Sequence, residues 1–174
     1  MGSRRIGVLT LSLLVLGIVL PGAASAGAVR NVQIMDRCDP ASFNALFGAG
    51  VCVDRAAGVP VTTFLARVNP KDGGHSAWRF APGQLSLRPG QSLRLNNRGG
   101  ETHSFTEVVD FGLGVVPGLD ASLPPGTPPA VPVDEDALNF LDAGVTMDLG
   151  ALPSGTHRFE CLIHPWMRAT VRQS

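Results

Sequence analysis

The chain has 174 residues, of which 44% are hydrophobic and 16% are charged, and its 14 basic residues are balanced by 14 acidic ones. This balance argues against a nucleic-acid partner, because such a partner is bound by a concentration of positive charge. The length suits one domain with a hydrophobic core, and the abundant glycines and prolines predict many turns.

The first segment has the pattern of a secretory signal. Two arginines precede an apolar run at residues 6–20, which is followed by Pro21 and by small residues up to Ala26. This pattern predicts a signal peptide at residues 1–26. A retained membrane anchor is the alternative, although a spanning helix needs about 20 apolar residues. We expect a secreted or periplasmic protein that has no stable membrane span after cleavage.

The three cysteines, an odd number, predict one disulfide and one free thiol. Cys38 and Cys52 lie close together in the sequence, whereas Cys161 lies far away. We therefore expect a disulfide between Cys38 and Cys52 and a free thiol at Cys161. An intermolecular bond or a different pairing is the alternative. We expect the disulfide in an N-terminal extension with the first strands at residues 27–76, ahead of a core at residues 77–174.

Short alternating stretches predict an all-β domain, because no segment of helix length after the signal has a convincing helical period. One short helix is expected at residues 36–46, where Asp39 and Pro40 suit its first turn. Residues 60–68 predict a strand that begins at a proline and lies at a sheet edge. Further strands are predicted at residues 77–80, 85–88, 92–96 and 145–149. We expect successive antiparallel strands to direct one set of leucines into the core: Leu85, Leu87, Leu93 and Leu95.

Residues 111–144 are rich in glycine, proline and acidic side chains. They predict a long connection with little regular structure. Its most acidic part is the stretch at residues 134–136. Either a docking surface for a basic redox partner or an ordinary solvated loop would account for this charge.

The C-terminal region contains the residues with the most distinctive chemistry. A thiol, an imidazole and a thioether lie on one short loop at Cys161, His164 and Met167. His103 follows a glycine turn at the entrance of an expected strand and supplies a second imidazole. Two imidazoles, a thiolate and a weak axial thioether form copper sites that transfer one electron. The sequence therefore predicts a copper site formed by His103, Cys161, His164 and Met167.

Other polar residues are weaker candidates. We expect His75 to be a loop histidine and His157 to be a hydrogen-bonded strand histidine. Glu107 could supply an oxygen ligand only in an unusual copper site, because sulfur is already present. Trp166 would lie either in an apolar docking patch around His164 or in the core. The sequence has no Ser-His-Asp order, HExxH motif or phosphate-binding loop, so we expect no enzyme.

The stretch Cys161-Leu162-Ile163-His164-Pro165-Trp166-Met167 resembles the copper loop of cupredoxins, especially those similar to amicyanin and plastocyanin. Asn96-Asn97 followed by His103 resembles the segment with the first ligand. The resemblance covers residues 77–109 and 145–172. It implies a Greek-key β-sandwich, one type 1 copper and an electron entry edge at His164. The N-terminal extension and the long proline-rich connection depart from the minimal domain.

These observations favour an exported blue copper protein that carries single electrons between transient redox partners and acts as a monomer. Two alternatives remain. A copper storage or delivery protein would hold Cu(I) without cycling. A cupredoxin-fold interaction module would have no working redox site. Rapid reversible oxidation and reduction would distinguish an electron carrier from a storage or delivery protein. Failure to bind copper with all four ligands intact would favour the interaction module.

Overall fold

The computed structural model describes residues 27–53 and 58–174, so the predicted signal peptide at residues 1–26 lies outside the described residues. Two four-stranded sheets have the orders β2-β1-β4-β8 and β3-β10-β9-β6, and β5 pairs with β7. The strands are β1 (Val29–Met35), β2 (Arg79–Ala81), β3 (Gln84–Leu87), β4 (Ser92–Asn97), β5 (His103–Ser104), β6 (Thr106–Val108), β7 (Phe140–Leu141), β8 (Thr146–Gly150), β9 (Gly155–Glu160) and β10 (Arg168–Gln173).

The two large sheets share one hydrophobic core, so the predicted all-β sandwich is confirmed. Its centre is a row of aromatic rings, in which Phe105 lies between Phe80 and Phe159. The rings of Phe105 and Phe159 are nearly parallel, and their centroids are 4.3 Å apart. Aliphatic side chains from both sheets surround this row, including Val32, Ile34, Leu93 and Leu95 from the first and Leu85, Leu87 and Val171 from the second.

The four predicted core leucines are buried, but their strands do not pair as expected. β3 pairs in parallel with β10, and β4 pairs in parallel with β1, so the two strands lie in different sheets. The prediction of successive antiparallel strands was therefore wrong. The Pro89-Gly90 turn allowed either a hairpin or a crossing between sheets, because both bury the same alternating leucines.

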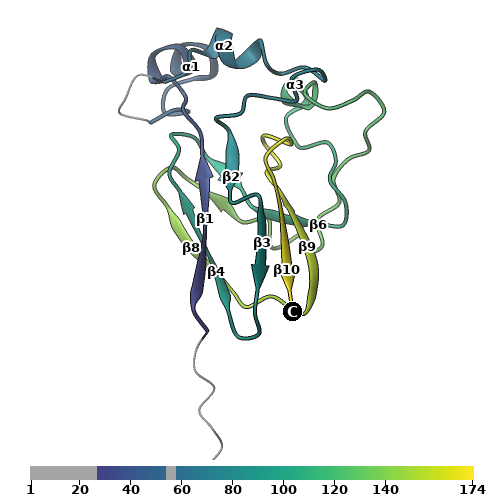
Figure 1. Cartoon of the computed structure of the whole chain (residues 1–174). Helices are drawn as coiled ribbons and strands as arrows, with labels where there is room; N and C mark the ends of the chain where they lie inside the picture. The colour runs from purple at the N-terminus through teal and green to yellow at the C-terminus, as the bar shows by residue number, and fades with distance from the viewer. Residues whose placement is uncertain (1–26, 54–57) are drawn as a thin grey trace, which may run out of the picture.

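After β1, the part of the N-terminal extension that contains the helices α1 (Pro40–Phe47) and α2 (Val61–Leu65) forms a layer at one end of the sandwich (Figure 1). Helix α1 begins after Asp39, whose carboxylate accepts the N–H of Ser42 at 3.0 Å, as the sequence predicted. The side chain of Asn44 forms two hydrogen bonds with the backbone of Cys52, both 2.9 Å long. These bonds hold Cys52 opposite Cys38, and the predicted disulfide between them is present.

The predicted strand at residues 60–68 was wrong, because the segment contains the helix α2 (Val61–Leu65). Val61 and Phe64 are buried, whereas Thr63 and Leu65 are exposed. Buried positions three residues apart match one turn of a helix and not the alternation of a strand. Packing of Phe64 against Phe43 and Trp78 outweighs the β-branched composition of this segment.

The long connection contains little regular structure, as predicted. Within it lie the short helix α3 (Pro117–Asp120) and the two-residue strand β7. Figure 1 shows α1, α2 and α3 at the end of the sandwich towards which the β9–β10 loop extends, and the C-terminus lies at the opposite end. The described residues include no helix long and apolar enough to cross a membrane.

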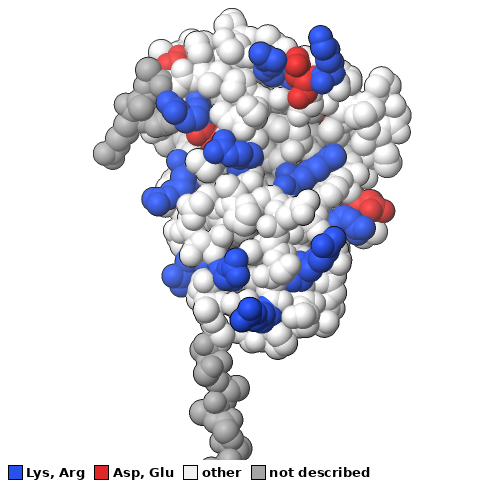
Figure 2. All heavy atoms as spheres, in the orientation of Figure 1, with Lys and Arg blue, Asp and Glu red and all other residues white. Residues whose placement is uncertain are grey.

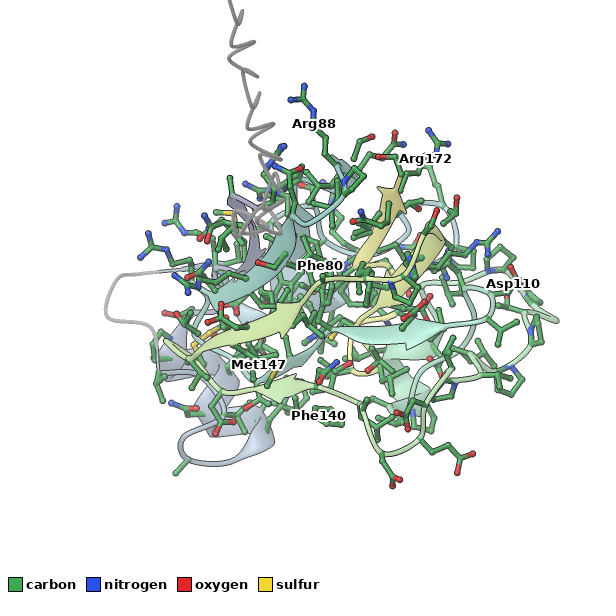
Figure 3. All side chains as sticks on the ribbon, turned by 90° about the horizontal axis from the view of Figure 1, so that it is seen from below. Phe80, Arg88, Asp110, Phe140, Met147 and Arg172 are labelled. Carbon is green, nitrogen blue, oxygen red and sulfur yellow. A yellow bond between two sulfur atoms is a disulfide. The ribbon has the colours of Figure 1, made fainter. Side chains whose placement is uncertain are left out.

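Basic side chains gather on part of the surface. Figure 2 shows Lys and Arg residues spread over one face of the molecule, with few acidic side chains among them. Seen from the end opposite the helices, Arg88 and Arg172 point outward, whereas Phe80 lies in the interior (Figure 3). Arg88 lies in the connection between β3 and β4, and Arg172 belongs to β10. The basic side chains extend over the visible face from the part near the helices to the opposite end (Figure 2).

Candidate metal centre

The predicted ligands come from two parts of the fold. Cys161 directly follows β9, and His164 lies in the loop that leads to β10. The N–H of Cys161 donates to the carbonyl of Met167 at 3.0 Å, and the N–H of Met167 donates to the carbonyl of His164 at 2.8 Å. Pairing of Arg168 with Glu160 closes the hairpin below the loop. The loop therefore has both ends fixed by the sheet.

His103 is the first residue of β5 and reaches the same loop from the side. Its neighbour Ser104 joins the two segments, because the Ser104 Oγ accepts the N–H of Leu162 at 2.8 Å. The N–H of Ser104 points to the Sγ of Cys161 at 3.4 Å, as does the N–H of His164. These contacts fix β5 against the ligand loop and direct two N–H groups at the sulfur.

Three donor atoms converge at this point. The Nδ1 atoms of His103 and His164 each lie 3.7 Å from the Sγ of Cys161, and the three atoms lie within 4.8 Å of one another. All three side chains are buried, with at most 2% of each residue exposed. One sulfur and two imidazole nitrogens in a dry site fit the donor set of a copper ion. Three of the four sequence-predicted residues are thus brought together.

The thiol of Cys161 is prepared to act as a thiolate. Burial would raise its pKa, but hydrogen bonds and positive charge from His103 and His164 together hold the pKa well below the ordinary value of 9.0. Burial also opposes charge on His103, yet its contacts with Asp36 and Cys161 raise the pKa of its imidazole to about 9. Because metals bind the thiolate form, this environment favours metal binding at Cys161.

Met167 ends the loop, and 1% of the residue is exposed. Its backbone is tied to both Cys161 and His164 by the hydrogen bonds described above. The side chain belongs to the same buried cluster as Cys161. The predicted thioether ligand is therefore on the same closed loop as the thiolate and one imidazole.

Carboxylates lie against the far nitrogen of both histidines. The Nε2 of His103 is 2.8 Å from the Oδ2 of Asp36, and the Nε2 of His164 is 3.9 Å from the Oε2 of Glu101. Glu101 also accepts the indole N–H of Trp78. Burial raises the pKa of Glu101, although the charge of His164 opposes this effect. Sequence reasoning missed Asp36 and Glu101, because neither has a spacing that relates it to the ligand loop.

The N-terminal layer covers His164. Its ring lies 6.2 Å from the ring of Phe64 in α2 and 5.4 Å from that of Trp166, measured between centroids. Only 2% of His164 is exposed, so little of the electron entry edge implied by the resemblance reaches the surface. An apolar hollow of about 260 Å³ reaches His164 and Glu101 from the surface, and its lining includes Phe47, Val51, Leu65, Leu119 and Ile163.

The remaining candidates do not enter the centre. The Nδ1 of His75 accepts the N–H of Ala77, as expected of a loop histidine. His157 lies between the carboxylate of Glu107, 2.7 Å from its Nδ1, and the carbonyl of Pro153, 2.9 Å from its Nε2. His157 is thus the hydrogen-bonded strand histidine that the sequence predicted. Glu107 is occupied by His157 and is not part of the donor cluster.

Among known proteins, the similarity found is to solved structures. No family model and no curated protein matches the chain. A purple cupredoxin from Nitrosopumilus maritimus has a similar structure, with 12% identity, a TM-score of 0.42, and coverage of 83% of this chain and 98% of that chain. An amicyanin variant in the Cu(I) form is similar at 18% identity and a TM-score of 0.37, over 55% of this chain and 73% of that chain.

The chain resembles cupredoxins. A Cu-containing nitrite reductase from Thermus scotoductus is also similar, at 18% identity and a TM-score of 0.35, but the match spans only 20% of that protein. The two sheets with their shared core form the β-sandwich that the sequence predicts, and the resemblance to cupredoxins is one of fold alone. Function has to be argued from the residues of this chain.

Proposed function

We propose that this chain is an exported electron carrier with one type 1 copper held by His103, Cys161, His164 and Met167. The observation that supports this function most strongly is the convergence of the Cys161 Sγ with two imidazole Nδ1 atoms in a buried site. A copper ion bound there alternates between Cu(I) and Cu(II), which supplies the transfer of one electron.

The surrounding residues suit a centre that must keep one geometry in both oxidation states. The hairpin fixes both ends of the ligand loop, and the N–H groups of Ser104 and His164 hold the sulfur of Cys161. Phe64 and Trp166 pack against the ring of His164. A rigid, dry donor set limits the rearrangement that accompanies electron transfer.

Export is supported by the disulfide between Cys38 and Cys52, because such bonds persist in oxidising compartments. We extend the proposal to a signal peptide at residues 1–26, an extension at 27–76 and a cupredoxin core at 77–174. The partners are redox proteins that bind transiently to a monomer. The apolar hollow beside His164 is the surface that we expect such a partner to contact.

One observation favours a second function, storage or delivery of Cu(I). His164 is covered by the N-terminal layer, and a covered ligand slows electron exchange with a partner. Rapid and reversible oxidation and reduction at a single potential would support the electron carrier. Tight Cu(I) binding without such cycling would support storage.

The proposed function is tested by adding Cu(II) to the protein that begins at Gly27. We expect an intense visible band from charge transfer between the thiolate and copper, with narrow copper hyperfine splitting in the EPR spectrum. Both features arise from a Cu–thiolate bond in a type 1 geometry. A pale, ordinary Cu(II) spectrum would contradict the proposal.

The Met167→Leu variant tests the axial ligand. We expect it to keep the visible colour, because the sulfur of Cys161 and the two imidazoles remain in place. Its reduction potential should rise, because the weak axial thioether tunes that potential. Cyclic voltammetry on the copper-loaded protein measures the change, and a potential equal to that of the unmodified chain would exclude Met167 as a ligand.

A further inference from the structure

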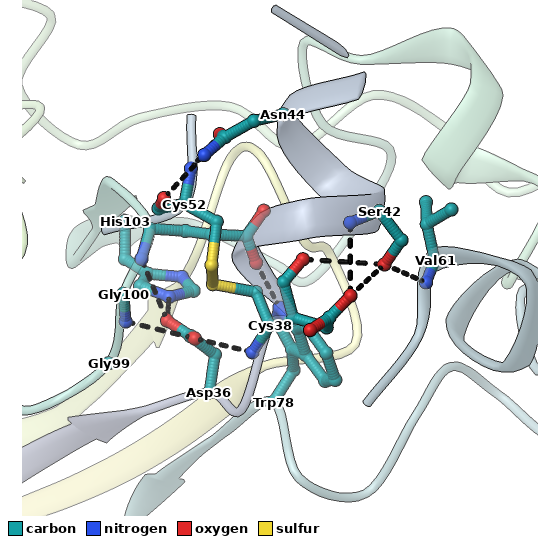
Figure 4. The surroundings of a disulfide bond; sticks show 12 residues. Asp36, Cys38, Ser42, Asn44, Cys52, Val61, Trp78, Gly99, Gly100 and His103 are labelled. Carbon is teal, nitrogen blue, oxygen red and sulfur yellow. Dashed lines mark hydrogen bonds and ion pairs between the residues drawn. A yellow bond between two sulfur atoms is a disulfide. The ribbon is translucent and has the colours of Figure 1, made fainter. Parts of the chain in front are cut away.

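A buried carboxylate lies directly behind the first histidine of the centre. Asp36 follows the last residue of β1, and its side chain has no exposed surface. Its oxygens accept the N–H groups of Cys38, Gly100 and Glu101 at 3.2, 3.0 and 3.1 Å. Figure 4 shows this carboxylate between the disulfide, the glycine turn and the ring of His103.

Asp36 determines how His103 presents its ring. The Oδ2 of Asp36 lies 2.8 Å from Nε2, while Nδ1 faces the Sγ of Cys161 at 3.7 Å. A carboxylate accepts hydrogen bonds and donates none, so Nε2 must carry a proton. The lone pair of Nδ1 is then directed at the site where a metal would bind.

Asp36 also brings a negative charge into the core. Both oxygens of Asp36 accept hydrogen bonds, from three backbone N–H groups and from the Nε2 of His103, and a carboxylate surrounded by donors is stabilised in its ionised form. Among the described residues, His103 is the one ionisable base within ion-pair distance of this carboxylate. The charge of Asp36 therefore lies close enough to a metal at Nδ1 that the oxidation state of this metal decides the sum of the buried charges.

The proposal follows from counting these buried charges. We propose that Asp36 is a positioning residue that favours Cu(II) over Cu(I) and gives the centre a low reduction potential, an inference that rests on the proposed copper function. With Cu(II), the ion, the thiolate of Cys161 and the carboxylate of Asp36 sum to zero, and Glu101 behind His164 adds the same charge to either oxidation state. With Cu(I) they leave one uncompensated negative charge, which is costly in a buried site. Without Asp36, the neutral combination would be the reduced one.

The test replaces Asp36 by a side chain of the same shape. Asp36→Asn keeps an oxygen that can accept the Nε2 proton, so the copper-loaded variant should retain its visible band. Its affinity for Cu(II) should fall at least tenfold more than its affinity for Cu(I). For a one-electron couple, this difference corresponds to a rise in reduction potential of about 59 mV. Voltammetry and competition with Cu(I) chelators measure the two quantities.

Asp148→Asn is the matched control. It removes the same charge from Asp148 on β8, which forms an exposed ion pair with Arg94 on β4, where solvent screens the change. A potential shift in Asp36→Asn no larger than in this control would overturn the proposal. Equal losses of Cu(I) and Cu(II) affinity would also overturn it, because they would indicate a purely structural role.

Measurements on the Zn(II)-loaded protein test the role of Asp36 independently of the proposed copper function. In Zn(II)-loaded protein, nitrogen-15 NMR should show a proton on the Nε2 of His103, and this measurement needs no variant that might fail to fold. Zn(II) affinity should fall roughly tenfold in Asp36→Asn. An unprotonated Nε2 would overturn the role of Asp36. Failure to form a type 1 copper spectrum, with these zinc results intact, would overturn the proposed function alone.

Discussion

Replacing Cys161 by serine is expected to abolish the intense visible band that Cu(II) produces in the unmodified protein. The band requires charge transfer from a thiolate, and within the described residues Cys161 is the single free cysteine. A serine oxygen at this position can neither supply that transition nor match the soft donor that favours Cu(I). Absorption and EPR spectra after Cu(II) addition measure the loss, which we expect to be complete.

Two observations would decide how this result is interpreted. Circular dichroism should show a folded Cys161→Ser protein, because serine is smaller than cysteine and can still accept the N–H groups of Ser104 and His164. His75→Ala is the control, since His75 contacts Ala77 and lies outside the donor cluster, and it should keep full colour. A strongly coloured Cys161→Ser protein would refute the copper assignment.

The ligand loop could be predicted from the sequence because its parts are contiguous. Cys161, His164 and Met167 lie within one turn of the chain, so their proximity hardly depends on the fold. His103 is 58 residues from Cys161 and was predicted only because its residue type completes the donor set. The odd number of cysteines likewise predicted the disulfide without any knowledge of the fold.

The residues that sequence reasoning missed are those placed by tertiary structure. Asp36 is 67 residues from His103, and it reaches the ring because β1 pairs with β4 beside the glycine turn. An aspartate two residues before a disulfide cysteine has no local pattern that indicates a partner. The cover over His164 was missed for a related reason, because a predicted strand at residues 60–68 could not place Phe64 on that ring.

The N-terminal extension therefore contacts the metal ligands directly. It supplies Asp36 to one histidine and Phe64 to the other. The N–H of Val53 also donates to the carbonyl of Gly100 at 2.8 Å, in the turn that precedes His103. Changes that loosen the extension should consequently alter the ligands, even though no ligand belongs to it.

Removing the disulfide is expected to give the largest loss of stability. Cys38 and Cys52 are 14 residues apart, and a bond that closes a loop of this size contributes about 3 kcal/mol in the chain-entropy model. Both residues are at most 1% exposed, so alanine at each position would also leave unfilled volume in the core. The Cys38→Ala/Cys52→Ala protein should unfold at lower urea concentration, with a free energy of unfolding reduced by about 3 kcal/mol.

The comparison is made in a Cys161→Ser background, because a free thiol could exchange with the disulfide during unfolding. Hydrogen exchange then shows which elements lose stability. If the extension opens locally, protection should fall first in α1, while β9 and β10 stay protected. A loss below about 1 kcal/mol would contradict the prediction. It would mean that Phe43, Phe64 and Trp78 hold the layer on the sandwich without the covalent bond, because their rings already pack together under α1 and α2.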